Sequence, residues 1–159
     1  MNAGWFALAA VGAVILGLSV AGALGPVITP AEQLTDAVLQ DAWAQIALLR
    51  QHRVAHRDLR LANLFLGADG TVWLIDFGFS EMAASDLLIA NDVAELVASS
   101  AVVVGAERAT APALASVDAA TRLRGSERLR PWALSGATRT ALKEQAGLLE
   151  QLRERLGAS

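Results

Sequence analysis

The feature that most constrains this chain is the segment from His56 to Glu81, HRDLRLANLFLGADGTVWLIDFGFSE. Two short apolar runs, LFL and TVWLI, are separated by a turn that begins and ends with glycine, which predicts a β-hairpin. Asn63 directly precedes this hairpin, Asp76 directly follows it, and Asp58 lies a few positions upstream. Carboxylate and amide oxygens are hard ligands, so these three residues are candidates for binding a divalent cation.

The composition limits the classes of protein to which the chain can belong. Its 159 residues provide room for one modest domain. The hydrophobic content of 54% and the mean hydropathy of +0.42 are high for a soluble protein and indicate a membrane-embedded part. A net charge of −3 provides no basic field, so nucleic acid is not expected as a partner. Cysteine is absent, which excludes disulfides and thiolate metal sites.

The start of the chain is apolar. No charged side chain occurs between Met1 and Glu32. The apolar run extends over more than the ~20 residues that cross a bilayer as a helix, so residues 1–28 are predicted to be a single-pass transmembrane anchor. Small residues recur along one face and would let a partner membrane helix approach closely: Ala9, Ala13, Gly17 and Ala21. The expected location is therefore the cell membrane.

Two other interpretations of residues 1–28 stay open. Ala21-Gly22-Ala23 has the small-x-small form of a signal-peptide cleavage site, although no Lys or Arg precedes it. A buried core helix is the second alternative, which the length and all-round apolar character of the segment disfavour. Because the first arginine is Arg50, the distribution of positive charge does not decide the orientation in the membrane.

Helices are predicted on both sides of the hairpin. Thr29 to Glu32 have the form of a capping box with proline at the first helical position, so a helix is expected from about Pro30. Further helices are predicted over 87–104 and 142–156, whereas 105–130 gives no clear periodicity. The fold class is therefore mostly α (α+β), with one short β-hairpin, and residues 29–159 form the domain.

The motif residues resemble a known family. His56-Arg57-Asp58, then Asn63, then Asp76-Phe77-Gly78 match in identity and spacing the C-lobe signature of the protein-kinase-like superfamily. The resemblance covers residues 30 to about 105 and implies an ATP- and Mg²⁺-dependent transfer of phosphate to a hydroxyl group. It implies that Asp58 orients the acceptor hydroxyl and accepts its proton. It also implies that Asn63 and Asp76 hold Mg²⁺ and that Arg60 faces the γ-phosphate.

The same resemblance assigns supporting roles to other residues. His56 and Phe77 would pack the loop against the metal-binding segment, and Gly78 would permit an unusual backbone angle. Asp92 would tie down the backbone of the loop that contains Arg57. For Arg57 and Asp92 an ordinary structural role is equally open.

Several other polar residues have a simpler interpretation. His52 and His56 are spaced as a metal pair but lack a third ligand. The arginines at 122, 124, 128, 130 and 139 are expected to form a solvated face, with anionic lipid headgroups as the alternative contact.

The spacing after the motif indicates which kinases are similar. Asp92 follows Asp76 so closely that little room is left for the long activation segment of regulated protein kinases. This spacing resembles compact atypical types such as RIO-like, lipopolysaccharide and aminoglycoside kinases. The stretch from His56 to Lys143 also resembles kinase-like segments of actinobacterial membrane proteins, which pair them with lysylphosphatidylglycerol-synthase-like or flippase-like regions.

The N-lobe of a kinase is expected to be absent from this chain. No lysine precedes Lys143, and the glycines between Gly12 and Gly25 lie in an apolar run rather than in a phosphate loop. Nucleotide binding should then be weak unless another segment or chain supplies an N-lobe. Because export would separate an ATP-dependent enzyme from its nucleotide, the domain is expected to face the cytoplasm. The competing interpretations are a catalytically inactive, pseudokinase-like interaction module anchored in the membrane, and an exported protein with a cleaved leader.

Overall fold

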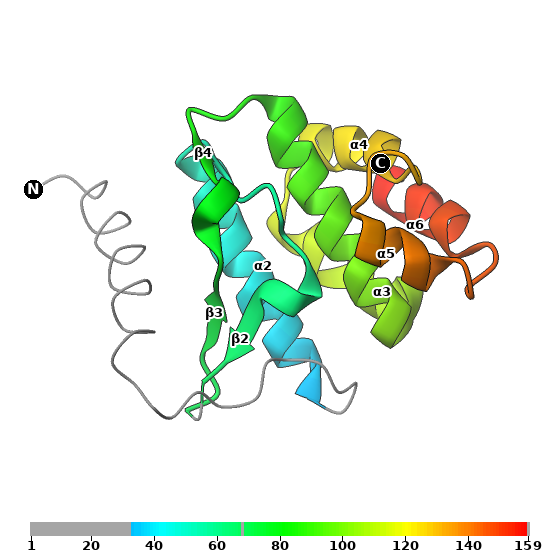
Figure 1. Cartoon of the computed structure of the whole chain (residues 1–159), viewed down its shortest axis with the longest axis horizontal. Helices are drawn as coiled ribbons and strands as arrows, with labels where there is room; N and C mark the ends of the chain where they lie inside the picture. The colour runs from blue at the N-terminus through cyan, green and yellow to red at the C-terminus, as the bar shows by residue number, and fades with distance from the viewer. Residues whose placement is uncertain (1–32, 68, 159) are drawn as a thin grey trace, which may run out of the picture.

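The computed structural model describes residues 33–67 and 69–158, and within them the predicted mostly helical fold class is confirmed (Figure 1). The helices of the first half are α2 (Asp36–Gln51) and the single turns η2 (Leu61–Asn63) and η3 (Phe77–Phe79). The second half contains α3 (Asp86–Ser116), α4 (Ala119–Arg128), α5 (Gly136–Leu142) and α6 (Leu148–Gly157). The strands are β1 (Val54–Ala55), β2 (Leu64–Leu66), β3 (Val72–Leu74) and β4 (Glu81–Met82).

The first described helix begins later than the sequence pattern indicates. A helix from Pro30 is wrong, because α2 begins at Asp36 and Thr35 is its N-cap, accepting the Val38 N–H at 3.3 Å. The proposed capping box at 29–32 lies outside the described residues. The apolar face of α2 is buried as expected, and Trp43 lies fully inside the core.

The predicted β-hairpin is present, and a second strand pair accompanies it. β2 and β3 are antiparallel with Leu64 opposite Leu74, and Gly70 donates its N–H to the Gly67 carbonyl at 2.9 Å. β1 pairs with β4, which the sequence pattern does not predict because each strand has only two residues. The β1–β4 pair joins the segments on either side of residues 56–80, so it closes this stretch into a compact unit.

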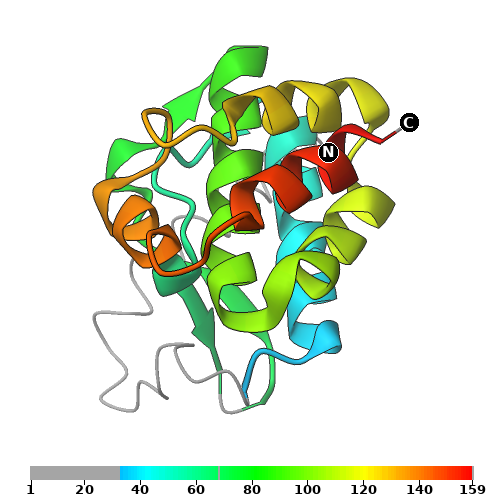
Figure 2. The same ribbon diagram turned by 90° about the vertical axis from the view of Figure 1, so that its right-hand side faces the viewer.

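α3 is the central element of the fold. It contacts α2 on one side and α4, α5 and α6 on the other (Figures 1 and 2). The helix predicted over 87–104 corresponds to its first part, and the helix direction breaks at Gly105, where φ is 81° and ψ is 166°. By length and hydropathy α3 is the one helix of the described part that could cross a bilayer, yet 61% of its most apolar window is buried inside the protein. This burial identifies the central helix of a folded core.

The C-terminal part differs from the single helix predicted over 142–156. Two helices, α5 and α6, are separated by a turn at Gly147, which has a φ of 80°. The segment 105–130, which gave no clear periodicity, forms the second part of α3 and then α4. α4 packs closely on α3 because residue 125 is glycine: a Cβ atom there would lie 3.0 Å from Val93 Cγ1.

The transmembrane anchor predicted for residues 1–28 lies outside the described residues, together with its stripe of small side chains. The anchor therefore stays a prediction.

Candidate functional site

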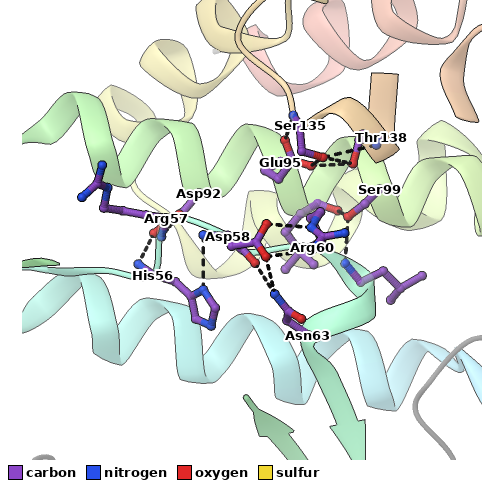
Figure 3. Close-up of polar contacts among 12 residues, drawn as sticks. His56, Arg57, Asp58, Arg60, Asn63, Asp92, Glu95, Ser99, Ser135 and Thr138 are labelled. Carbon is purple, nitrogen blue, oxygen red and sulfur yellow. Dashed lines mark hydrogen bonds and ion pairs between the residues drawn. The ribbon is translucent and has the colours of Figure 1, made fainter. Parts of the chain in front are cut away.

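The loop from His56 to Asn63 contains most of the predicted site residues and is fixed to α3 by Asp92 (Figure 3). The Asp92 carboxylate accepts the backbone N–H of His56 at 2.6 Å and that of Arg57 at 2.8 Å. Arg57 has a φ of 68°, a left-handed conformation that is costly for an arginine. The two hydrogen bonds hold the backbone in this conformation, which is the tie expected of Asp92 from the sequence.

His56 connects this loop to the segment that contains Asp76. Its side chain is fully buried, its Nε2 lies 2.8 Å from the Ile75 carbonyl oxygen, and its ring centroid lies 4.6 Å from that of Phe77. Burial lowers the pKa of His56, against the smaller upward effects of Ile75, Asp58 and Asp76. A neutral imidazole donates from Nε2 and accepts at Nδ1, which lies 3.4 Å from the Asp58 nitrogen. His56 and Phe77 thus pack between the two segments, as the resemblance implied.

Asp58 is held as an ionised carboxylate by its neighbours. Arg60 binds it through two parallel contacts, Nε to Oδ1 at 2.7 Å and Nη2 to Oδ2 at 2.8 Å. Asn63 donates from Nδ2 to Oδ2 at 2.9 Å and to the Asp58 carbonyl oxygen at 2.7 Å. These hydrogen bonds, with that of Arg60 the strongest, lower the pKa of Asp58 despite partial burial.

Asn63 and Asp76 are brought together by the hairpin. Because β2 and β3 are antiparallel, the residue before β2 lies beside the segment after β3, and the Ile75 N–H donates to the Asn63 carbonyl at 3.0 Å. Asp76 follows Ile75 and has a left-handed backbone, with φ 63° and ψ 59°. Its negative charge is among the smaller effects that raise the pKa of His56 and that of Arg60.

One expectation about this segment is wrong. The unusual backbone angle belongs to Asp76 and not to Gly78, which lies in the single turn η3 without a positive φ. Aspartate tolerates the left-handed region better than most residues, because its short side chain can interact with the local backbone. A Cβ at residue 78 would lie 3.4 Å from Asp76 Oδ1, which is an ordinary contact.

Two other predicted features do not belong to the site. The Arg57 side chain points to the surface and lies 3.4 Å from Glu81. His52 is exposed at the end of α2, whereas His56 is buried, so the two histidines do not form a metal pair. Among the described residues no cluster of three histidine or acidic side chains is arranged to hold a metal ion.

Sequence reasoning missed a polar network directly above the loop. Glu95, one turn after Asp92 on α3, is buried and accepts three hydrogen bonds: from the Ser135 N–H at 2.8 Å, the Ser135 hydroxyl at 2.7 Å and the Thr138 hydroxyl at 2.5 Å. Ser135 is also the N-cap of α5. The signal available in the sequence was this cap, since a serine before a short helical segment predicts a helix start.

The network separates two cavities that open beside the loop. One has a volume of about 310 Å³ and is lined mainly by polar side chains of the loop and α3, including Arg57, Asp58, Asn91, Asp92 and Glu95. The other has a volume of about 240 Å³ and is lined by Arg60 and a set of apolar residues described below. Asp58 and Arg60, which contact each other, each line one cavity.

Comparison with known proteins finds local sequence similarity to kinases. No family model matches the chain. The chain is 45% identical over 47 residues to the serine/threonine-protein kinase ppk24, mitochondrial, of Schizosaccharomyces pombe, covering 30% of this chain and 10% of that protein. It is 41% identical over 46 residues to the serine/threonine-protein kinase kin-29 of Caenorhabditis briggsae, covering 29% of this chain and 6% of that protein. The identity to kin-29 of Caenorhabditis elegans is 32% over 59 residues, covering 37% and 7%.

These local matches, which cover 29–37% of the chain, support a kinase-like relationship. The matched segments span a tenth or less of the curated relatives' own length. The activity and substrates of a whole kinase are therefore matters for a proposal about this chain.

Proposed function

We propose that this chain carries the acceptor- and metal-binding half of a membrane-associated, compact kinase-like enzyme that uses Mg²⁺ and ATP to phosphorylate a hydroxyl group. The observation that carries the proposal is the contact between Asp58 and Asn63, beside Asp76, on a loop whose backbone is fixed by the buried Asp92. Fixed polar groups are what phosphoryl transfer requires, since its catalysis is mainly positioning and charge stabilisation.

In this proposal Asp58 binds and orients the acceptor hydroxyl. Arg60 occupies one acceptor direction of Oδ1, and Arg60 and Asn63 together occupy both directions of Oδ2, so the second direction of Oδ1 is the one left for a hydroxyl group. The lowered pKa of Asp58 keeps it ionised, so that it can accept a hydrogen bond from the hydroxyl. Arg60 keeps its positive charge near the site and would meet the negative charge of a transferred phosphate.

The donor set at Asn63 and Asp76 fits Mg²⁺. The Asn63 amide nitrogen is directed at Asp58, which leaves the amide oxygen of the same group for a cation. Asp76 contributes a carboxylate on an exposed segment, and Mg²⁺ prefers such hard oxygen ligands and keeps several waters. When bound, Mg²⁺ would neutralise phosphate charge. Without contacts from an N-lobe, which another segment or chain would supply, the nucleotide would bind weakly.

The experiment is a titration of the full-length chain with a fluorescent ATP analogue, with Mg²⁺ and with EDTA. We expect binding that depends on Mg²⁺ and that Asp76→Asn weakens by about tenfold or more, because even partners outside the metal's ligand shell alter affinity by that factor. Asp69→Asn is the matched control, since Asp69 is an exposed carboxylate in the turn of the same hairpin. Equal binding by wild type and Asp76→Asn would overturn the proposal.

A catalytically inactive interaction module is the second candidate. The observation in its favour is the paired contact of Arg60 with both oxygens of Asp58, which closes the carboxylate in this structure. This alternative predicts no phosphate transfer and nucleotide binding, if any, that does not change with Mg²⁺. The same titration therefore separates the two candidates.

A further inference from the structure

Beside Asp58 lies an apolar cleft that the phosphotransfer residues do not use. The cleft is formed between the His56–Asn63 loop, α3 and α5, and its volume is about 240 Å³. We define the apolar cleft by the residues that line it: Arg60, Leu61, Ala62, Ser99, Val102, Val103, Ala137, Thr138 and Ala141. Arg60 is its only charged member, and the Arg60 guanidinium contacts Asp58 at 2.7 and 2.8 Å. The cleft therefore begins where an acceptor hydroxyl would bind.

The polar groups at the edge of the apolar cleft are already hydrogen-bonded. The Ser99 hydroxyl accepts the Leu61 N–H at 3.0 Å and lies 3.3 Å from the Leu96 carbonyl oxygen, to which it donates. The Thr138 hydroxyl donates to Glu95 (Figure 3). The surface offered to a ligand is therefore hydrocarbon from alanine, valine and leucine side chains. Such a surface binds an apolar group, since covering it removes apolar area from water.

The polar cavity of about 310 Å³ on the other side of Asp58 indicates which charge the head group of the same ligand can carry. It is lined by the carboxyl groups of Asp58, Asp92 and Glu95, and Arg57 is its one cationic residue. This excess of acidic groups disfavours a carboxylate or phosphate head and favours an uncharged or amine-bearing one. Asp58 lines this cavity and Arg60 lines the apolar cleft, so the two lie on either side of the Asp58–Arg60 ion pair, and a molecule with its hydroxyl at Asp58 would reach both.

We propose that the acceptor is an amphipathic alcohol, with its polar, non-anionic head in the cavity beside Asp58 and its hydrocarbon chain in the apolar cleft. This inference rests on the proposed phosphotransfer function for the role of the hydroxyl, but the binding of the chain is measurable without any transfer. Small side chains keep the cleft open, because Ala62, Ala137 and Ala141 each occupy a position where a larger residue would fill it.

The test is photocrosslinking of the full-length chain, mixed with phosphatidylcholine vesicles, to a dodecan-1-ol that carries a diazirine in its chain. Mass spectrometry maps the labelled residues. We expect the label on residues 60–62, 99–103 and 137–141, and weaker labelling by the dodecanoic acid with the same diazirine. The acid has the same chain and an anionic head, so the comparison isolates the effect of the head group.

A matched pair of variants makes the test specific. Ala137→Leu fills the cleft at the second residue of α5, and Ala120→Leu makes the same change at the exposed second residue of α4. Displacing about two methylene groups of the ligand from the cleft should lower labelling about tenfold in Ala137→Leu. Ala120→Leu should label like wild type. Thermal unfolding by circular dichroism verifies that both variants fold, and Ala62→Leu repeats the test from the opposite wall.

The outcomes separate this inference from the proposed function. Labelling outside the cleft, or equal labelling of wild type and Ala137→Leu, overturns the inference. An acid probe that labels as strongly as the alcohol overturns the assignment of the head group. The same samples are titrated with Mg²⁺ and the ATP analogue, so labelled protein without Mg²⁺-dependent nucleotide binding refutes the phosphotransfer function while the hydrocarbon site stands.

Discussion

Replacing the buried Asp92 with asparagine is expected to remove the loss of stability that wild type undergoes as the pH rises to neutral. The Asp92 side chain is 6% exposed and accepts two backbone N–H groups of the His56–Asn63 loop. Burial nevertheless raises the pKa of Asp92 from 3.8 to about 6, because the two N–H groups and Arg57 offset only part of the cost of removing the charge from water. The negative charge of Glu95 adds to the upward shift.

The direction of the pH dependence follows from this raised pKa. A carboxyl group whose folded-state pKa is raised holds its proton more tightly in the folded chain than in the unfolded one. Its contribution to the free energy of unfolding is fully present below pH 3.8 and is lost as the pH rises through about 6. At 1.36 kcal/mol for each pKa unit, the loss is on the order of 3 kcal/mol.

Asparagine does not titrate, but it offers only one acceptor oxygen, whereas Asp92 accepts the His56 N–H on Oδ2 and the Arg57 N–H on Oδ1. Asp92→Asn should therefore be less stable than wild type near pH 4, by about 1–3 kcal/mol for the N–H group left without a partner. Between pH 4 and pH 7 the difference should shift in favour of the variant by on the order of 3 kcal/mol, because only wild type loses stability as its carboxyl group ionises. The measurement is urea unfolding of both full-length proteins, followed by far-ultraviolet circular dichroism, across this pH range. His56 titrates in both proteins, so its contribution cancels in the difference.

Asp36→Asn is the control for this measurement, since Asp36 is an exposed carboxylate in the first turn of α2. Its difference from wild type should stay small at every pH. If the difference in stability between Asp92→Asn and wild type moved in favour of wild type as the pH rises, the raised pKa of Asp92 would be contradicted. A difference that does not change with pH would refute the reasoning as well.

Two further predictions concern the neighbours of this loop. Arg60→Ala should raise the pKa of Asp58, because the two contacts from Arg60 are the main reason that this pKa is low. NMR titration of the Asp58 carboxyl carbon measures the change, and an unchanged pKa would contradict it. Ser135→Ala should cost about 2–3 kcal/mol of stability, because it removes both a helix N-cap and a hydrogen bond to the buried Glu95. Ser85→Ala, which removes only the exposed N-cap of α3, should cost about 1 kcal/mol in the same denaturation assay, and equal costs would contradict the role of Glu95.

The elements with strong local signals could be predicted from the sequence. The hairpin followed from two apolar runs around a glycine-bounded turn, and the first part of α3 followed from its continuous apolar character. The start of α2 was misplaced because two capping signals, at Thr29 and at Thr35, lie within one stretch, and the described helix uses Thr35. The single helix predicted over 142–156 failed because Gly147 interrupts a periodic apolar pattern.

In the site, too, residues close together in the sequence could be predicted as neighbours, whereas residues far apart in the sequence could not. Asp58 and Asn63 were predicted as neighbours from the motif, and their contact is present. Glu95 could not be found in this way, because its partners Ser135 and Thr138 are about forty positions away and only the fold brings them together. The two-residue strands β1 and β4 carry no periodicity, so their pairing was also invisible in the sequence.

The central position of α3 has a consequence for how the protein is made. α3 leaves the ribosome before α4 and α6, yet these later helices cover much of its surface. Until they are synthesised, the nascent chain displays a helix with the length and hydropathy of a bilayer-crossing segment. Chaperones or the insertion machinery would therefore meet that helix before α4 and α6 cover it.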